Sequence, residues 1–271
     1  MLELLKQSKN TKHINITLPK NRLIAIGDIH GCLEELELLL NELNITNTDI
    51  VIFLGDLVDR GPSSGLVVEE IAELCKLGNY YCVQGNHDNK HVRYARHELI
   101  KLSNQAYTNP MHPNEAFLQA HSQLSNNNII FLSSMPHAIT IDNLYCFVHA
   151  GVTPSLFKQN PQAFIRNRYF TEKESKLTPA KTYCINNQWY VPEGAKPWYS
   201  YYNHSFTTIY GHAVQLEPLI VGKTIGIDTG CCFGGKLTAV IFQEGKYEFC
   251  CVPARKCYSS DHAYQVDTQK S

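Results

Sequence analysis

The stretch Leu23-Ile24-Ala25-Ile26-Gly27-Asp28-Ile29-His30-Gly31 joins a short apolar run to a polar step of glycine, aspartate and histidine. The pattern recurs in Gly55-Asp56-Leu57-Val58-Asp59-Arg60-Gly61 and in Gly85-Asn86-His87-Asp88. Each apolar run is typical of a buried strand, and successive motifs lie about one strand–helix–strand unit apart. This order predicts parallel strands with right-handed crossovers, so all three motifs should meet at one edge of a sheet.

Leucine spacing and turn residues predict the remaining elements. Strands are expected over 23–26, 50–54, 80–83, 138–141, 144–148, 207–210, 224–227, 237–242 and 247–252, and helices over 33–43, 63–78, 89–101 and 114–124. Asp142-Asn143 suits a hairpin turn, and the short, closely spaced strands after residue 138 favour antiparallel pairing. We expect an α/β protein with two sheets face to face and helices outside them.

Composition limits the classes of function. The chain has 271 residues, 44% of them hydrophobic, and a net charge of −1, so it lacks the basic footprint of a general nucleic-acid binder. No run approaches the ~20 apolar residues of a membrane span. Residues 1–10 are too polar for a secretory signal, and the cysteines lie mostly in apolar runs typical of reduced thiols. We therefore expect a cytoplasmic protein that does not bind membranes, while export by a signal elsewhere in the chain stays open.

The domain organisation predicted from these patterns is a single catalytic domain with two short flanks. Residues 1–21 form an N-terminal extension, 22–254 form the domain, and 255–271 form a polar C-terminal tail. Within the domain, residues 155–205 are rich in tyrosine, tryptophan, asparagine and proline, and are expected to form loops and short helices over the site.

Two later strands also end in histidine, in His149-Ala150-Gly151 and Gly211-His212. The candidate metal ligands are therefore Asp28, His30, Asp56, Asn86, His149 and His212. Asp56 is the natural bridge, because a carboxylate has two oxygens: one cation would take Asp28, His30 and Asp56, and the other Asp56, Asn86, His149 and His212. Two divalent cations ~3.5–4 Å apart clamp a phosphate and activate the water that attacks phosphorus in line.

The motifs GDIHG, GDLVDRG, GNHD, HAG and YGH, in this order, resemble those of the calcineurin-like metallophosphoesterases. GDLVDRG more narrowly resembles the phosphoprotein phosphatase superfamily, which includes serine/threonine phosphatases and symmetrical diadenosine tetraphosphatases. The run at 227–239 is similar to the end of bacterial members, and the resemblance covers about 22–243. It implies a four-layer α/β/β/α sandwich of two mixed sheets, a bimetal site at the strand ends (often manganese, sometimes iron or zinc), and attack by a metal-bound hydroxide.

The resemblance also implies roles around the metals. His87 would be the general acid that protonates the leaving oxygen, and Asp59 would orient its imidazole. Arg60 and Asn86 would hold the substrate phosphate, together with Arg168 or Arg166, between which the sequence does not choose. Asp88 stands where eukaryotic protein phosphatases carry glutamate, which favours bacterial relatives and weakens the transfer of protein-substrate specificity.

The main functional prediction is a phosphomonoesterase resembling serine/threonine protein phosphatases, acting on a phosphorylated protein or peptide. The alternative is symmetrical hydrolysis of a dinucleoside polyphosphate, diadenosine tetraphosphate. A non-catalytic scaffold for phosphorylated partners is disfavoured, because every catalytic position is filled. The remaining histidines are interpreted as surface or packing residues. The aromatics of residues 155–205, here called the insert, are interpreted as packing, although they could instead stack a nucleobase. The histidines are His91, His97, His112, His121 and His137, and the aromatics are Trp189, Tyr190, Trp198, Tyr199, Tyr201 and Tyr202.

Overall fold

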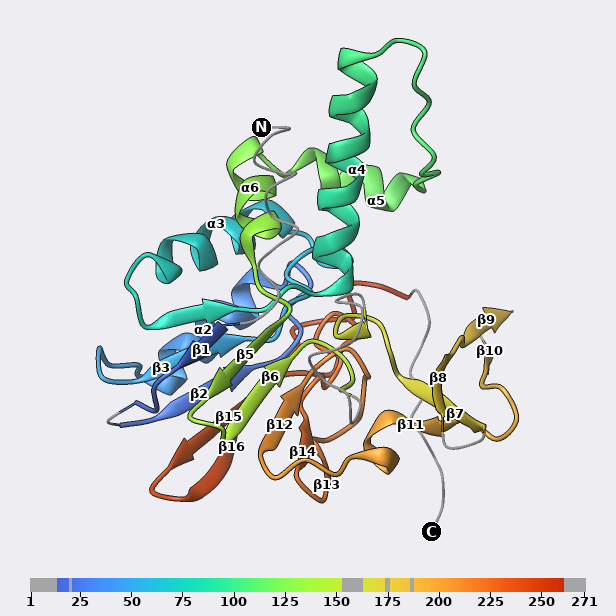
Figure 1. The fold of residues 1–271 in the computed structure, drawn as a ribbon. Helices are drawn as coiled ribbons and strands as arrows, with labels where there is room; N and C mark the ends of the chain where they lie inside the picture. Colours follow the sequence, from blue (N-terminus) through green and yellow to red (C-terminus); the bar gives the residue numbers. More distant parts are fainter. Residues whose placement is uncertain (1–13, 20, 153–162, 174–175, 186–187, 261–271) are drawn as a thin grey trace.

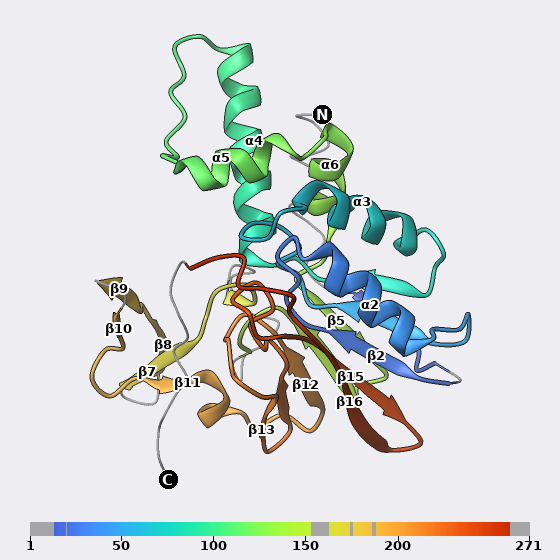
Figure 2. The same cartoon turned by 180° about the vertical axis from the view of Figure 1, so that it is seen from behind.

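The computed structural model describes residues 14–19, 21–152, 163–173, 176–185 and 188–260. Two mixed β-sheets pack face to face in this part of the chain, and helices cover one outer face (Figures 1 and 2). The predicted α/β/β/α sandwich is confirmed. The outer face of the second sheet is covered, within these residues, by the aromatic insert and its 3₁₀ helix η4 (Trp198–Tyr201). No helix within these ranges has the length and apolar character that a membrane span requires.

The first sheet carries the three N-terminal motifs. Its strand order is β16-β15-β2-β3-β4, with β2 at Leu23–Ile26, β3 at Ile50–Phe53, β4 at Tyr80–Cys82, β15 at Lys236–Gln243 and β16 at Lys246–Pro253. Strands β2, β3 and β4 are parallel, as predicted, while β15 runs antiparallel to both of its neighbours. The motifs that follow β2, β3 and β4 consequently meet at one sheet edge.

The second sheet supplies the two later histidine motifs. Its order is β1-β5-β6-β12-β14-β13, with β1 at Ile14–Ile16, β5 at Ala138–Ile141, β6 at Tyr145–Val148, β12 at Thr207–Tyr210, β13 at Leu219–Val221 and β14 at Thr224–Gly226. β6 and β12 are parallel neighbours, so the motifs after them lie side by side. β1 pairs with β5, so part of the predicted N-terminal extension belongs to this sheet.

Helices cover the first sheet because each exposes an apolar stripe toward it. They are α2 (Leu33–Leu43), α3 (Ser64–Cys75), α4 (Asn86–Ser103), α5 (Glu115–Ser122) and α6 (Asn126–Ser134). One cluster of buried apolar residues joins α2, α3, α4 and α6 to the first sheet, and a second fills the space between the sheets. Helix α5 instead packs its Phe117 against His91 and Tyr94 of α4. The inter-sheet layer comes from alternate strand residues such as Ala25, Ile52, Phe147, Ile209 and Val240.

Three predictions of local structure need correction. Antiparallel pairing after residue 138 is right for β5–β6 and β15–β16, but β12 runs parallel to β6 and β14, because long connections allow crossovers. Helix α4 begins at Asn86 rather than at residue 89, and α6 was not predicted. The insert forms strands instead of only loops and helices: β7 (Tyr169–Lys173), β8 (Lys176–Ala180), β9 (Tyr183–Ile185), β10 (Gln188–Tyr190) and β11 (Lys196–Pro197).

Candidate metal centre

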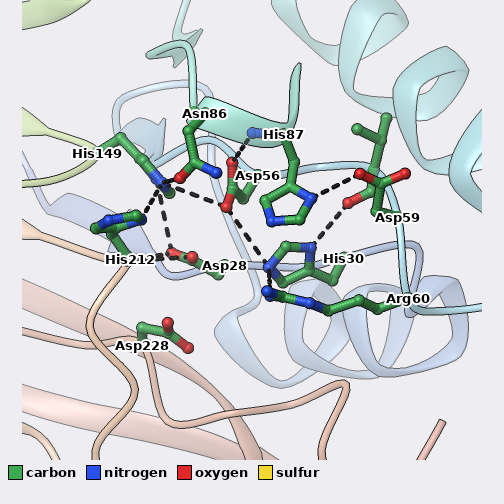
Figure 3. A network of polar contacts seen from close by, with 12 residues as sticks. Asp28, His30, Asp56, Asp59, Arg60, Asn86, His87, His149, His212 and Asp228 are labelled. Atoms are coloured by element: carbon green, nitrogen blue, oxygen red, sulfur yellow. Dashed lines mark hydrogen bonds and ion pairs between the residues drawn. The ribbon is translucent and has the colours of Figure 1, made fainter. Parts of the chain in front are cut away.

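The motif turns adopt a backbone conformation that is rare outside glycine. Positive φ angles occur at His30 and Asp56 (both 50°), His212 (66°), Asp59 and Arg60 (both 71°). Such conformations cost about 1–3 kcal/mol each and persist where the surrounding structure holds them. Here they turn each side chain back toward the sheet edge immediately after its strand, which brings the predicted ligands together (Figure 3).

Asp56 lies at the centre of the site. Its Oδ2 atom lies 3.6 Å from Nε2 of His30 and 3.3 Å from Nε2 of His149, while Oδ1 accepts a hydrogen bond from the backbone N–H of His87 at 2.8 Å. One oxygen is thus held by the start of α4 and the other faces two imidazoles. Burial opposes ionisation, but His149 and His87 outweigh it and hold the pKa of Asp56 well below its usual range. The geometry suits a bridging carboxylate.

Backbone carbonyl groups orient the two imidazoles that flank Asp56. Nδ1 of His149 lies 2.9 Å from the Leu54 oxygen, and Nδ1 of His30 lies 2.8 Å from the Val58 oxygen. An imidazole that donates from Nδ1 presents the Nε2 lone pair, as metal-ligating histidines do. Burial and Arg60 also lower the pKa of His30 well below its usual range, which favours the neutral form that binds metals.

The second metal position would lie beside His149. Its Nε2 atom lies 3.1 Å from both Asn86 Oδ1 and His212 Nδ1. Burial and Arg168 hold the pKa of His212 well below its usual range. Burial lowers the pKa of His149, but Asp56 and Asp28 outweigh it and raise that pKa to about 9. The carboxylates of Asp56 and Asp28 therefore stabilise a positive charge at this position.

The donor set fits divalent cations. Ligand atoms of His30, Asp56 and His87 lie within 4.8 Å of one another, and so do those of Asp56, His149 and His212. Mixed carboxylate, imidazole and amide ligands are typical of hydrolytic metal sites. His87 is in the first group because its ring nitrogen lies close to the other two ligand atoms. The family resemblance implies a role in acid catalysis for it instead.

Asp28 follows β2 of the first sheet and lies close to His212, which follows β12 of the second sheet. Its two oxygens each lie 3.1 Å from the His212 backbone nitrogen. Burial and nearby Asp228 raise the pKa of Asp28 well above its usual range, so a cation would be needed to stabilise its charge. Gly211 is required here, because a Cβ atom at that position would lie 2.0 Å from Asp28 Oδ1. Asp228 follows β14 and was not singled out from the sequence.

A chain of polar contacts leads from His87 into α4. Asp59 Oδ2 lies 2.6 Å from His87 Nδ1, Asp59 Oδ1 lies 2.7 Å from His91 Nε2, and His91 Nδ1 lies 2.9 Å from His121 Nδ1. Burial opposes the charge on Asp59, but the bonds from His87 and His91 hold its pKa well below the usual range. The sequence pattern indicated a surface or packing role for His91. The side chain is fully buried and contacts the Asp59 carboxylate directly. Its position one turn after His87 was the available signal.

Three arginines line a cavity of about 620 Å³ over the site: Arg60, Arg166 and Arg168. Arg60 Nη1 lies 2.5 Å from His30 Nε2, and its guanidinium stacks 4.9 Å from the Phe233 ring centre. Arg168 donates to the backbone oxygen of His212 at 2.7 Å, whereas Arg166 is exposed. Each could therefore reach an anion above the metal positions.

Asp88 is a structural anchor of the site. It accepts hydrogen bonds from the backbone nitrogens of Asp56 (2.8 Å), Leu57 (3.0 Å) and Gly85 (2.8 Å). These three bonds tie the turn after β3 to the start of α4. The aspartate that stands here in place of glutamate therefore holds the backbone of the second and third motifs together.

Four of the candidate aromatics of the insert, Trp198, Tyr199, Tyr201 and Tyr202, pack within the protein, whereas Tyr190 is exposed. Trp198 is 3% exposed and lies against Tyr199, Tyr202 and Tyr210 at the outer face of the second sheet. Tyr201 belongs to the same cluster. These contacts favour the packing interpretation for this part of the insert. The side chain of Trp189 lies outside the described residues, as do 155–162, 174–175 and 186–187 of the predicted insert.

The chain is similar in sequence to known proteins over most of its length. The chain is 29% identical over 254 residues to bis(5′-nucleosyl)-tetraphosphatase PrpE (asymmetrical) of Oceanobacillus iheyensis, covering 89% of this chain and 95% of that protein. It is 28% identical over 235 residues to the Bacillus subtilis protein of the same name, covering 81% and 90%.

Solved structures share the fold. The structure superposes on the crystal structure of a candidate diadenosine tetraphosphatase with a TM-score of 0.68 at 27% identity, covering 90% of this chain and 98% of that one. A serine/threonine phosphatase from Saccharomyces cerevisiae, at 14% identity and a TM-score of 0.56, matches in fold alone, over 92% and 85% of the chains. Residues 21–216 match the calcineurin-like phosphoesterase family. The protein is therefore a metallophosphoesterase of the calcineurin-like family, a phosphoric ester hydrolase whose family implies divalent metal ions.

Proposed function

We propose that this enzyme is a bis(5′-nucleosyl)-tetraphosphatase that cleaves a dinucleoside tetraphosphate such as diadenosine tetraphosphate. The observation that carries the proposal is its 28–29% identity to tetraphosphatases over nearly the whole of both chains. The cavity lined by three arginines supports it, since guanidinium groups match polyphosphate oxygens in charge and shape. We therefore favour hydrolysis of a dinucleoside polyphosphate, the alternative that the sequence raised, over the protein-phosphatase prediction.

The metal ligands proposed are the six predicted from sequence, with Asp56 bridging. Asp28 and His30 would complete one position, and Asn86, His149 and His212 the other. Bound divalent cations, for which we propose manganese, would neutralise phosphate charge and lower the pKa of the attacking water. The support is the convergence of carboxylate and imidazole atoms around Asp56 Oδ2.

The chain's own residues would position substrate and move a proton. Arg60, with Arg166 or Arg168, would hold the phosphate undergoing attack. A water oxygen would form the new bond to phosphorus as the bond to the leaving oxygen breaks. His87 would protonate the leaving oxygen. Asp59 would keep the His87 imidazole oriented through the 2.6 Å contact at Nδ1.

The bond that is cleaved is part of the proposal. The relatives are named asymmetrical, and we propose the same position here, giving a nucleoside triphosphate and a monophosphate. The symmetrical mode expected from sequence would give two diphosphates instead. Both modes need the same metal centre, so product identity separates them.

The test compares diadenosine tetraphosphate with a phosphothreonine peptide, using manganese-loaded protein and a chelator control. ATP and AMP in equal amounts, lost on chelation, are the expected products. Two molecules of ADP would overturn the asymmetrical position but keep the function. Turnover of the peptide without cleavage of the dinucleotide would overturn the function and restore the phosphomonoesterase prediction.

A further inference from the structure

A second cavity adjoins the catalytic groups on the side away from the arginine-lined one. Its volume is about 870 Å³, and it runs from Asp59, Arg60 and His87 to helix α5 and the segment 256–260. His87 and Arg60 line both cavities. The two spaces therefore flank the catalytic groups, and a substrate bound across them would pass over His87.

Two lysines face this second cavity from different parts of the chain. Lys90 lies on α4 three residues after His87, and residues at this spacing share a helix face. Lys256 comes from the segment after β16. Among the described residues that line the cavity, Asp59 is the one acidic side chain, and it accepts from His87 and His91. Neither lysine has a carboxylate partner within the described ranges.

Aromatic rings hold the two ammonium groups in place. Lys90 Nζ lies 4.3 Å from the centre of the Phe117 ring, and Lys256 Nζ lies 5.3 Å from that of Tyr258. Phe117 is 3% exposed and stacks on His91, while Tyr258 donates a 2.7 Å hydrogen bond to Glu35. Both rings are thus fixed, and each contact limits where its lysine can move. The cations are arranged in advance of any ligand.

The position of His87 says which part of a substrate would lie here. A general acid must reach the leaving oxygen, so the leaving group departs on the side of the His87 imidazole. A serine or threonine residue leaving from a phosphoprotein carries no charge that needs two ammonium groups. A nucleotide leaving from a dinucleoside polyphosphate carries phosphates, which lysine binds as a point charge.

We propose that this second cavity binds the phosphates of the leaving nucleotide through Lys90 and Lys256. The inference rests on the tetraphosphatase function proposed above and makes the two lysines determinants of specificity for polyphosphate substrates over simple phosphomonoesters. It also makes the released nucleoside triphosphate a competitive inhibitor that retains these contacts.

The experiment measures inhibition by ATP of p-nitrophenyl phosphate hydrolysis at constant free manganese. Lys90→Gln and Lys256→Gln are each expected to raise the inhibition constant about tenfold, which corresponds to about 1.4 kcal/mol. Lys90→Arg should restore inhibition, because it keeps the charge. Lys101→Gln, at the exposed end of α4, is the matched control and should not change the inhibition constant.

Two further measurements separate this inference from the function on which it rests. Each glutamine variant should lose at least ten times more kcat/KM for diadenosine tetraphosphate than for p-nitrophenyl phosphate. If the unaltered enzyme does not cleave the dinucleotide but ATP inhibition still depends on the lysines, the cavity is supported and the proposed function fails. Absence of ATP inhibition, or inhibition that the glutamine variants leave unchanged, would overturn the cavity assignment whatever the substrate.

Discussion

Asp59 holds His87 by a 2.6 Å contact between Oδ2 and Nδ1, and this contact selects the imidazole nitrogen that faces substrate. With Nδ1 engaged by the carboxylate, Nε2 is the atom available for proton transfer. Under the proposed function, this pair would serve to protonate the leaving oxygen.

Replacing His87 with Asn tests this role. Turnover of phenyl phosphate, a poor leaving-group substrate whose phenolate needs a proton, should fall by about 10²–10⁴-fold, the usual contribution of a general acid. Hydrolysis of p-nitrophenyl phosphate should fall much less, because p-nitrophenolate leaves without a proton. Rates on both substrates and metal content by mass spectrometry provide the check. Equal slowing of both substrates would remove His87 as the general acid.

His91 is predicted to be a positioning residue, since its Nε2 atom lies 2.7 Å from the other oxygen of Asp59. His91→Gln should lower turnover of phenyl phosphate by about tenfold with less effect on p-nitrophenyl phosphate, repeating the leaving-group pattern of the His87 variant on a smaller scale. His112→Gln, in the loop before α5, is the control. A loss of stability without any change in the ratio of the two rates would assign His91 to packing alone.

Asp56→Asn should abolish turnover and metal retention together. Asp56 Oδ2 faces both His30 and His149, so its loss removes the proposed bridge between the two metal positions. Metal content per chain and turnover with excess manganese are the measurements, and a circular dichroism spectrum controls for folding. Full activity in this variant would disprove the bridging role.

Asp49, far from the active site, is predicted to make stability depend on pH. Burial alone would raise its pKa, but bonds from Arg22 and Thr46 lower it to about 2, below the unfolded value near 3.9. The contribution is therefore complete above about pH 4 and is lost as the pH falls through about 2. Asp49→Asn should lower the free energy of unfolding by about 2 kcal/mol at pH 7.

Urea unfolding of both proteins between pH 2 and pH 7 measures this difference, which should shrink toward zero at the acid end. Asp142→Asn provides a control, since Asp142 is exposed and accepts from the backbone nitrogen of Leu18 at the sheet edge. A difference that is independent of pH would contradict the predicted pKa.

Short-range order in the sequence was sufficient to predict the parallel strands and to select the six candidate ligands, whose metal binding stays a prediction. Each ligand follows directly after a buried strand, and parallel strands bring their carboxyl ends to one edge, so adjacency in sequence becomes adjacency in space. Asp56 and His149 follow strands of different sheets, so it is the packing of the two sheets that brings Oδ2 and Nε2 to 3.3 Å. Helix α2 was also predicted over its full length from leucine spacing.

Tertiary structure alone decided the features that depend on contacts between distant segments. The sequence could not show that His91 meets Asp59, that Asp88 holds three backbone nitrogens, or that Lys90 and Lys256 line one cavity. It also predicted antiparallel pairing where β12 lies parallel to β6, because strand direction depends on the path of the connecting insert. Local periodicity encodes which face of an element is buried, whereas pairing and partnership are set by packing the whole chain.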